Sequence, residues 1–411
     1  MRTRRLFYEN VYLREFEAEV LSCGKDERGQ YVVLDQTAFY PEGGGQPADL
    51  GTLYPVDGDN KCTVLDVQYG GSDEGEIRHY VENLLPVNCR VRGVLDWERR
   101  FDLMQQHSGE HIVSGFIHRK YGYDNVGFHM GEELITIDLN GLLDEGQLHQ
   151  IEQEVNNYIW TDRRARVFFP DEEEKNVLPY RSKKELTGEV RLVEFPGGDL
   201  CACCGLHVES TGEIGLVKLL SVKHFREGVR IEMAAGKRAL GLLHQHLEAN
   251  SRVASMLSVK PDGTPAAVQR LQDEIYSLKG EILALRQQQF AMRVKQCEGR
   301  GNVLLLEHAL DAADIRKEAD AVLDVCGGIC VVIALEDSQK DPEKKNTGGK
   351  YAAGQRNGDI RALVKEMNET LSGRGGGKPF FAQGSLQADR AVIKSFFEEK
   401  GFVIVDDASG A

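Results

Sequence analysis

The stretch QQHSGEHIV, residues 105–113, decides how the rest of this chain is organised. It places two histidines, His107 and His111, four residues apart in a segment that we predict to be helical. Residues i and i+4 lie on one face of a helix, about 6 Å apart along its axis, so two imidazoles at this spacing can bind one metal ion. An isolated HxxxH is common by chance, and the pair alone does not establish a metal site.

A second pair with the same spacing follows in CACCGLH, residues 201–207. Together the two pairs offer three imidazole nitrogens and one thiolate sulfur, a donor set that suits tetrahedral zinc. We therefore predict a zinc ion bound by His107, His111, Cys203 and His207.

Length and composition describe an ordinary globular protein. The chain has 411 residues, of which 41% are hydrophobic and 28% charged, which predicts about two to four domains. No apolar run reaches the ~20 residues of a membrane helix, and the N-terminus lacks the apolar core of a signal peptide. The chain has nine cysteines, and three of them, Cys201, Cys203 and Cys204, lie close together in the sequence. This pattern favours metal binding in a reducing, cytoplasmic protein over a disulfide framework. Cys201 and Cys204 form a CxxC that competes with the predicted ligand set.

The hydrophobic pattern predicts an α+β protein in four parts. Residues 1–95 contain short β-branched segments typical of a small β-barrel. Residues 96–236 mix helices and strands and carry both ligand pairs, residues 237–300 are helical, and residues 301–411 alternate strands and helices. Apolar residues from Val268 to Met292 form a heptad seam. The seam can close an antiparallel hairpin within the chain or pair two chains, so a homodimer is possible.

Two glycine-rich segments stand out. In TAFYPEGGGQP, residues 37–47, the glycines Gly43, Gly44 and Gly45 allow a close backbone approach to a ligand or a positive φ. A flexible turn would explain three glycines alone, whereas the flanking Tyr-Pro and Gln-Pro favour a shaped loop. In SGRGGGKP, residues 372–379, we predict a loop whose amides and cations could face phosphate, although a helix stop followed by a plain loop fits equally well.

The net charge of −15 would repel nucleic acid, so any such partner must be bound by local basic patches. From residue 340 to residue 378, nine Lys or Arg stand against five Asp or Glu, a local charge of +4. Arg374 and Lys378 flank the glycines of this segment and are the predicted phosphate contacts. We expect the stretch from Glu336 to Lys350 to be polar and mobile.

Four motifs together resemble a known family. TAFYPEGGGQP, DWERRFDLMQQHSGEH (residues 96–111) and CCGLHV (residues 203–208), in that order, are similar to the alanyl-tRNA editing proteins of the AlaX type and to the editing half of alanyl-tRNA synthetase. GRGGGKPFFAQG, residues 373–384, resembles the DHH-associated C-terminal domain of the synthetase and the long editing proteins. The resemblance implies a zinc-dependent hydrolase that removes serine, and as a second candidate glycine, from mischarged tRNA(Ala).

The resemblance also assigns roles to residues. The four predicted ligands fall on the zinc positions of the family, and the glycines 43–45 fall on the loop beside the editing pocket. Ser108 stands where the family usually has Thr, a hydroxyl implicated in recognising the serine side chain. Leu206 stands where the family usually has Thr. Because leucine has no side-chain donor or acceptor, this position cannot supply the hydrogen bond that Thr would give to the surroundings of the ligands. The C-terminal part, with Arg374 and Lys378, is expected to bind the body of tRNA. No synthetase module precedes the barrel, so aminoacylation is not expected.

Several alternatives stay open at this point. The zinc ion could activate water or only anchor the substrate, and Glu110 is a weak candidate for a general base. HSGEH also matches the inverted-zincin motif HxxEH of metallopeptidases, although thiolate is unusual among their ligands. A non-catalytic, zinc-stabilised tRNA-binding protein is a third reading. Hydrolysis of seryl-tRNA(Ala) separates the three.

Overall fold

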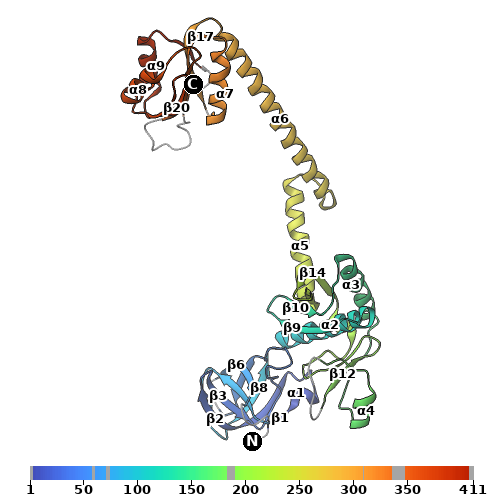
Figure 1. Cartoon of the computed structure of the whole chain (residues 1–411). Helices are drawn as coiled ribbons and strands as arrows, with labels where there is room; N and C mark the ends of the chain where they lie inside the picture. The colour runs from blue at the N-terminus through green and yellow to red at the C-terminus, as the bar shows by residue number, and fades with distance from the viewer. Residues whose placement is uncertain are drawn as a thin grey trace. The chain divides into compact units, whose positions relative to one another are not determined.

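The computed structural model describes residues 3–57, 61–70, 75–182, 190–308, 310–335 and 348–406 (Figure 1). The chain divides into two compact units, Met1–Pro261 and Asp262–Ala411. Each unit combines helices with β-sheets, so the predicted mixed α and β character is confirmed. The finer division into four domains stays a prediction. None of the described helices is both long enough and apolar enough to cross a membrane.

The first unit begins with a closed β-barrel, as predicted for residues 1–95. Its strands are hydrogen-bonded in the order β2-β3-β7-β6-β5-β8, and neighbouring strands run antiparallel. Alternate residues of β2 point inward, so that Phe16, Ala18 and Val20 help to fill the barrel. The barrel strands are β2 (Glu15–Asp26), β3 (Gly29–Leu34), β5 (Gly51–Pro55), β6 (Cys62–Tyr69), β7 (Ile77–Val81) and β8 (Arg90–Leu95). Beside it lie β1 (Arg4–Arg5), α1 (Leu6–Glu9) and β4 (Gln36–Thr37).

Helix α2 (Trp97–Tyr121) carries the HxxxH pair, as predicted. Its N-cap Asp96 accepts a hydrogen bond from the backbone N–H of Arg99, and the helix ends at Gly122, whose φ of 72° is left-handed. Most of its side chains from Leu103 to Ile117 are buried, because other elements cover it on nearly every side. The ion pair of Arg100 with Asp49 joins its first turn to the loop that follows the glycine motif.

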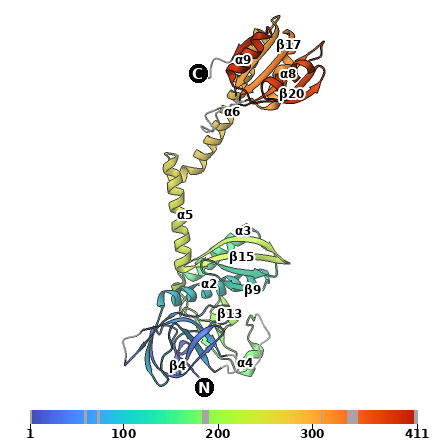
Figure 2. The same cartoon turned by 90° about the vertical axis from the view of Figure 1, so that its left-hand side faces the viewer.

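A four-stranded sheet in the order β14-β15-β10-β9 packs against α2 and α3 (Figure 2). The mixture of helices and strands predicted for residues 96–236 is present, with a hairpin of β14 and β15 and a helix that begins after Asp144. A second sheet, β11-β12-β13, brings the cysteine-rich segment against α2. The elements of this region are β9 (Asn125–Met130), β10 (Ile135–Leu139), α3 (Glu145–Ile159), β11 (Arg166–Phe168), α4 (Glu172–Val177), β12 (Leu192–Phe195), β13 (Asp199–Ala202), η1 (Thr211–Ile214), β14 (Val217–Phe225), β15 (Gly228–Ala235) and α5 (Gly236–Met256).

The second unit has a six-stranded sheet in the order β19-β20-β18-β17-β16-β21, with a hydrophobic cluster on each face. The mixture of strands and helices predicted for residues 301–411 is present. The elements are η2 (Pro261–Gly263), which spans the boundary, α6 (Thr264–Gln296), β16 (Gly301–His308), α7 (Ala312–Leu323), β17 (Gly327–Leu335), β18 (Gly349–Gln355), α8 (Arg361–Thr370), β19 (Arg374–Lys378), β20 (Phe381–Leu386), α9 (Arg390–Glu399) and β21 (Val403–Asp406).

The predicted glycine-rich loop around residue 375 is wrong, because Arg374–Lys378 is the edge strand β19, paired antiparallel with β20. Glycine is a poor strand former on its own. Here it fits because a Cβ at Gly375 would lie 2.5 Å from the backbone oxygen of Gln383 on β20, so only a residue without a side chain lets the strand approach β20 this closely. Most of the segment expected to be mobile lies outside the described residues.

The heptad seam lies on α6, and its apolar side chains are exposed. The described residues of the second unit therefore do not cover the seam. Pairing with α5 and pairing between two chains both stay predictions. The seam residues are Val268, Leu271, Ile275, Leu278, Ile282, Leu285 and Met292.

Candidate metal centre

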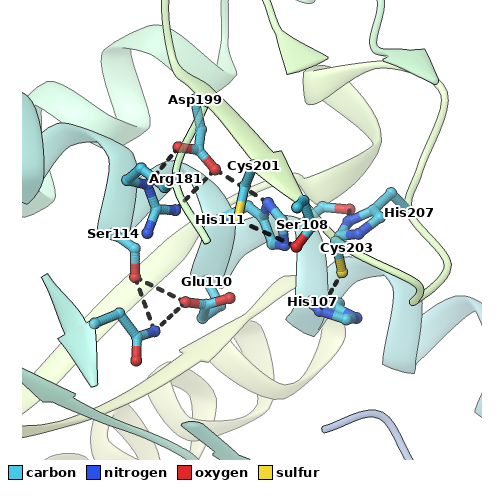
Figure 3. Close-up of polar contacts among 12 residues, drawn as sticks. His107, Ser108, Glu110, His111, Ser114, Arg181, Asp199, Cys201, Cys203 and His207 are labelled. Carbon is cyan, nitrogen blue, oxygen red and sulfur yellow. Dashed lines mark hydrogen bonds and ion pairs between the residues drawn. The ribbon is translucent and has the colours of Figure 1, made fainter. Parts of the chain in front are cut away.

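The structure brings the four predicted ligands together (Figure 3). His107 and His111 project from α2, and Cys203 and His207 come from the segment after β13. Their candidate ligand atoms all lie within 4.8 Å of one another. The Cys203 sulfur lies 3.4 Å from Nε2 of His107. The three imidazoles are almost completely buried, so the cluster is shielded from bulk water.

Each histidine has a hydrogen-bond partner at Nδ1, which leaves Nε2 for the cluster. Such partners orient metal-binding imidazoles and fix their tautomer. The pairs are His107 with Oε1 of Gln46 at 3.0 Å, His111 with Oδ2 of Asp199 at 3.1 Å, and His207 with Oγ of Ser108 at 3.3 Å.

The donor set fits a metal ion such as zinc. Nε2 of His207 is buried without a hydrogen-bond partner among the described residues, as expected for a nitrogen that binds a cation. Burial raises the pKa of Cys203, but His107 and His111 outweigh it and bring the pKa well below its usual value, toward thiolate. Burial and the neighbouring histidines lower the pKa of His207 to about 3, so this imidazole is neutral. Thiolate and neutral imidazole are the protonation states that bind metal. Burial lowers the pKa of His111, but Cys203 and Asp199 outweigh it and raise the pKa to about 9, so binding of an ion there would release a proton.

Asp199 supports His111 and is itself supported by Arg181. The guanidinium of Arg181 donates from Nε to Oδ1 at 2.7 Å and from a terminal nitrogen to Oδ2 at 2.8 Å. Burial raises the pKa of Asp199, and the bonds to His111 and Arg181 more than offset this, so the carboxylate is ionised. A buried carboxylate thus orients one ligand while its own charge is paired.

The competing cysteines differ from Cys203. Cys201 lies near His111 and Asp199 and could join a second ligand group with them. Burial and the charge of Asp199 raise its pKa, so Cys201 is a neutral thiol. Cys204 is an exposed residue, but the protein still removes part of the water around its sulfur, and this partial burial raises its pKa as well. The protonation states therefore favour Cys203 as the thiolate ligand.

The glycine motif forms a shaped turn beside the cluster, as its flanking residues predicted. Gly43 and Gln46 close the turn with two backbone hydrogen bonds of 3.1 and 3.0 Å, and Gly44 and Gly45 adopt φ of 62° and 82°. A Cβ at Gly45 would lie 2.6 Å from Cδ1 of Phe128. The turn is therefore packed in place, and the flexible-turn reading does not hold.

Glu110 faces another group of residues. Its carboxylate accepts hydrogen bonds from the Ser114 hydroxyl, at 2.7 Å, and from the Asn125 amide. Figure 3 shows it turned toward these groups rather than toward Cys203. The geometry gives no support to Glu110 as a general base, which an inverted-zincin peptidase would require.

The remaining predicted residues lie in the second unit. Arg374 and Lys378 sit at the two ends of β19 with exposed side chains. Sequence reasoning missed Gln46, Asp199 and Arg181. Gln46 closes the glycine motif and could have been noticed there, whereas Asp199 and Arg181 belong to no local pattern.

Comparison with known proteins adds family relationships. Residues 7–99 match the model of class II (A) tRNA synthetases, and residues 190–232 match the second additional domain of threonyl and alanyl tRNA synthetases. The C-Ala domain of Aquifex aeolicus alanyl-tRNA synthetase, at 18% identity and over 25% of this chain and 94% of that chain, has a TM-score of 0.19, too low for a structural argument.

Curated relatives are similar over almost the whole chain. The alanyl-tRNA editing protein AlaX-L of Pyrococcus horikoshii is 29% identical over 96% of this chain and 98% of that protein. Alanine–tRNA ligases of Methanoregula boonei and Methanocorpusculum labreanum are each 33% identical, over 93% and 98% of this chain. The chain spans only 41% and 43% of these two ligases. This chain is therefore similar over nearly its whole length to a long alanyl-tRNA editing protein and to the corresponding part of alanine–tRNA ligases.

Proposed function

We propose that this chain is a trans-editing hydrolase that deacylates mischarged tRNA(Ala), with seryl-tRNA(Ala) as the main substrate and glycyl-tRNA(Ala) as the second. The observation that carries the proposal is the convergence of His107, His111, Cys203 and His207 in a chain similar from end to end to an alanyl-tRNA editing protein. The proposed cofactor is one zinc ion on these four residues.

Hydrolysis breaks the ester bond between the carbonyl carbon of the amino acid and a ribose oxygen of the terminal adenosine. The oxygen of water adds to the carbonyl carbon, and the ribose oxygen leaves with a proton. When bound, zinc supplies a Lewis acid in the pocket. The residues of the chain hold the imidazoles in place, exclude bulk water and orient the aminoacyl end. The glycine turn, Gly43 to Gly45, is the proposed wall beside that end.

Ser108 is the proposed contact for the serine side chain. Its Oγ accepts from the backbone N–H of Val208 at 3.1 Å and lies 3.3 Å from Nδ1 of His207. A hydroxyl has two acceptor sites and one hydrogen, so both acceptor sites are used when this Nδ1 carries its hydrogen. The hydroxyl hydrogen of Ser108 then stays available to donate to a substrate hydroxyl.

We also propose that the second unit is a DHH-associated domain that binds the body of tRNA through Arg374 and Lys378. In an extended strand, residues four apart share one face of the sheet. Between these two cations that face carries only Gly376, so phosphate can approach without meeting a side chain. The local charge of +4 around them contrasts with the chain total of −15.

The test is release of labelled serine from seryl-tRNA(Ala), with alanyl-tRNA(Ala) as the control substrate. The native protein should hydrolyse the serine ester and spare the alanine ester. Removal of zinc by a chelator should abolish release, and added zinc should restore it. Retention of tRNA without release would favour the non-catalytic binding protein, and cleavage of peptides would favour the peptidase.

A further inference from the structure

Gln46 links the glycine turn to the metal centre, although nothing in the motif assigns it a role. Its side chain is fully buried. Its amide oxygen lies 2.9 Å from the backbone nitrogen of Leu206 and 3.0 Å from Nδ1 of His107. One atom of the turn therefore contacts both a ligand and the segment that carries the other ligand pair.

The bond to Leu206 determines which end of the Gln46 amide faces His107. A backbone N–H can only donate, so the side-chain atom that it meets must be the oxygen, which removes the usual ambiguity of an amide flip. The oxygen can only accept, so Nδ1 of His107 must carry a hydrogen. A metal-bound imidazole is neutral and has one N–H, so in that state Nε2 of His107, 3.4 Å from the Cys203 sulfur, keeps its lone pair for the ion.

The rest of the turn holds His107 from its other sides. The Phe128 ring stacks on the imidazole at 5.4 Å between centroids, with 23° between the planes, and Gly45 packs against Phe128. Gly205 lies so close beneath the imidazole that a Cβ there would stand 2.1 Å from Cε1. The ring has little room to rotate, so Nε2 faces the cluster, and the tautomer selected by Gln46 decides whether this nitrogen carries a lone pair or a hydrogen.

We propose that Gln46 is a positioning residue of the metal centre, which locks His107 in the Nδ1–H tautomer and joins the glycine turn to the CCGLH segment. The three glycines before it serve to place this amide. The metal centre itself belongs to the function proposed above, and the inference rests on that centre but not on the choice of substrate.

The amide nitrogen of Gln46 gives a clean test of the acceptor role. It is buried and has no hydrogen-bond partner among the described residues. Replacing it by oxygen in Gln46→Glu removes no bond and keeps an acceptor for both Leu206 and His107. Gln46→Met has a similar length but removes the acceptor. Gln30→Glu, on barrel strand β3, makes the same change of charge away from the cluster.

Zinc affinity of the full chain is measured by competition with a chromophoric chelator, without tRNA. Loss of a partner of a metal-binding histidine typically weakens binding 10- to 100-fold. We expect about this loss in Gln46→Met, whereas Gln46→Glu and Gln30→Glu should bind zinc as tightly as the native chain or, for Gln46→Glu, more tightly. Native affinity in Gln46→Met, or equal losses in Gln46→Met and Gln46→Glu, would overturn the proposal.

A second measurement covers the case in which Gln46→Met does not fold. Two-bond ¹H–¹⁵N NMR spectra of the native zinc protein distinguish the two tautomers of His107 by their nitrogen shifts. The proposal requires a protonated Nδ1 with Nε2 bound to metal, and a protonated Nε2 would refute it. Because neither measurement uses tRNA, a chain that binds zinc in this way but does not cleave seryl-tRNA(Ala) would contradict the proposed function and leave the role of Gln46 standing.

Discussion

Arg100 and Asp49 form an ion pair in which neither side chain exposes any surface. Asp49 also accepts from the backbone N–H of Tyr40 at 2.6 Å, and Arg100 also donates to the carbonyls of Ala38 and Val11, the latter at 3.0 Å. Every one of these partners lies in the N-terminal region, whereas Arg100 lies about two turns before His107 on α2. The pair therefore fixes the helix that carries two ligands to the loop that carries Gln46.

Breaking this pair should destabilise the first unit strongly. Removing one member of a buried ion pair leaves an uncompensated charge and costs about 3–5 kcal/mol. We expect Arg100→Met to lower the free energy of unfolding by this amount in urea titrations of the full chain. Arg92→Met, on the barrel surface, removes an exposed pair with Glu15 and should cost about 1 kcal/mol or less. Equal effects of the two changes would show that burial of the Arg100 pair is unimportant.

Metal content should depend on Cys203 but not on Cys201. The native chain is expected to bind one zinc ion, and His107→Ala and Cys203→Ala should lose most of it because each removes a ligand. Cys201→Ala should keep the metal, since Cys201 is a neutral thiol at the margin of the cluster. Metal analysis by mass spectrometry after gel filtration decides the matter. Full zinc in Cys203→Ala, or its loss in Cys201→Ala, would mean that the wrong thiol was chosen.

Ser108→Ala should distinguish recognition of substrate from support of His207. If Ser108 donates to the substrate hydroxyl, hydrolysis of seryl-tRNA(Ala) should fall roughly tenfold or more, while that of glycyl-tRNA(Ala), which has no side-chain hydroxyl, changes little. The measurement is kcat/KM for both substrates, with zinc content determined in parallel. If kcat/KM for both substrates and the bound zinc fall together, Ser108 supports His207 and does not contact the substrate.

The barrel should lose stability in mild acid through His79. This residue is fully buried, with Nε2 at 2.8 Å from the Thr37 hydroxyl and Nδ1 at 3.2 Å from the Val32 carbonyl oxygen. Burial lowers its pKa to about 4, and the bond to Val32 opposes this only in part. The unfolded chain takes up a proton near the ordinary value of about 6.5, and the folded chain does not. Stability should therefore decline as the pH falls from about 6.5 to 4, by roughly 3 kcal/mol at most.

The comparison that isolates His79 is His79→Gln, measured by urea unfolding at several pH values. The variant will be less stable at neutral pH, but its stability should decline less steeply over this range than that of the native chain. Acid effects of other groups are common to both proteins and cancel in the difference. Parallel pH profiles would rule out His79 as the source.

Binding of tRNA should depend on salt through β19. Replacing both Arg374 and Lys378 by Gln should weaken binding and reduce the slope of log K against log salt by roughly one unit for each phosphate that is no longer neutralised. Arg90 and Arg92 of β8 are two exposed cations in the other unit and serve as the control. Their double replacement should leave the slope unchanged. Filter binding at several salt concentrations measures this. An unchanged slope in the β19 variant would remove these residues from the interface.

Cys203 and His207 lie on no helix, so their four-residue spacing alone did not place them beside the histidines. The shared face of His107 and His111 could be predicted from sequence, because a four-residue spacing on a helix fixes it without knowledge of the fold. The partners of the ligands could not. Gln46 meets His107 across 61 residues, and Arg181 meets Asp199 through sheet pairing that no local pattern reveals. The barrel and most helices followed from hydrophobic periodicity.

The strands β18, β19 and β20 of the second unit escaped prediction, and the physical reason is clearest for β18 and β19. β18 (Gly349–Gln355) has little β-branched character but is buried between β17 and β20, which supply its hydrogen bonds. β19 consists of glycines and two cations, a composition typical of loops, and its pairing with β20 overrides that preference. In both strands, neighbours that are distant in sequence determine the conformation.

The closeness of Gly205 to His107 has a consequence for the mutational history of this chain. Every codon change that replaces glycine adds at least one carbon, and here that carbon would stand 2.1 Å from the imidazole. An exchange of the surrounding residues cannot make room, because the obstacle is His107, a proposed metal ligand. If residues 201–207 were randomised and functional clones sequenced, position 205 should return glycine as strictly as position 207 returns histidine. A residue with no chemistry of its own would then be as intolerant of variation as a metal ligand.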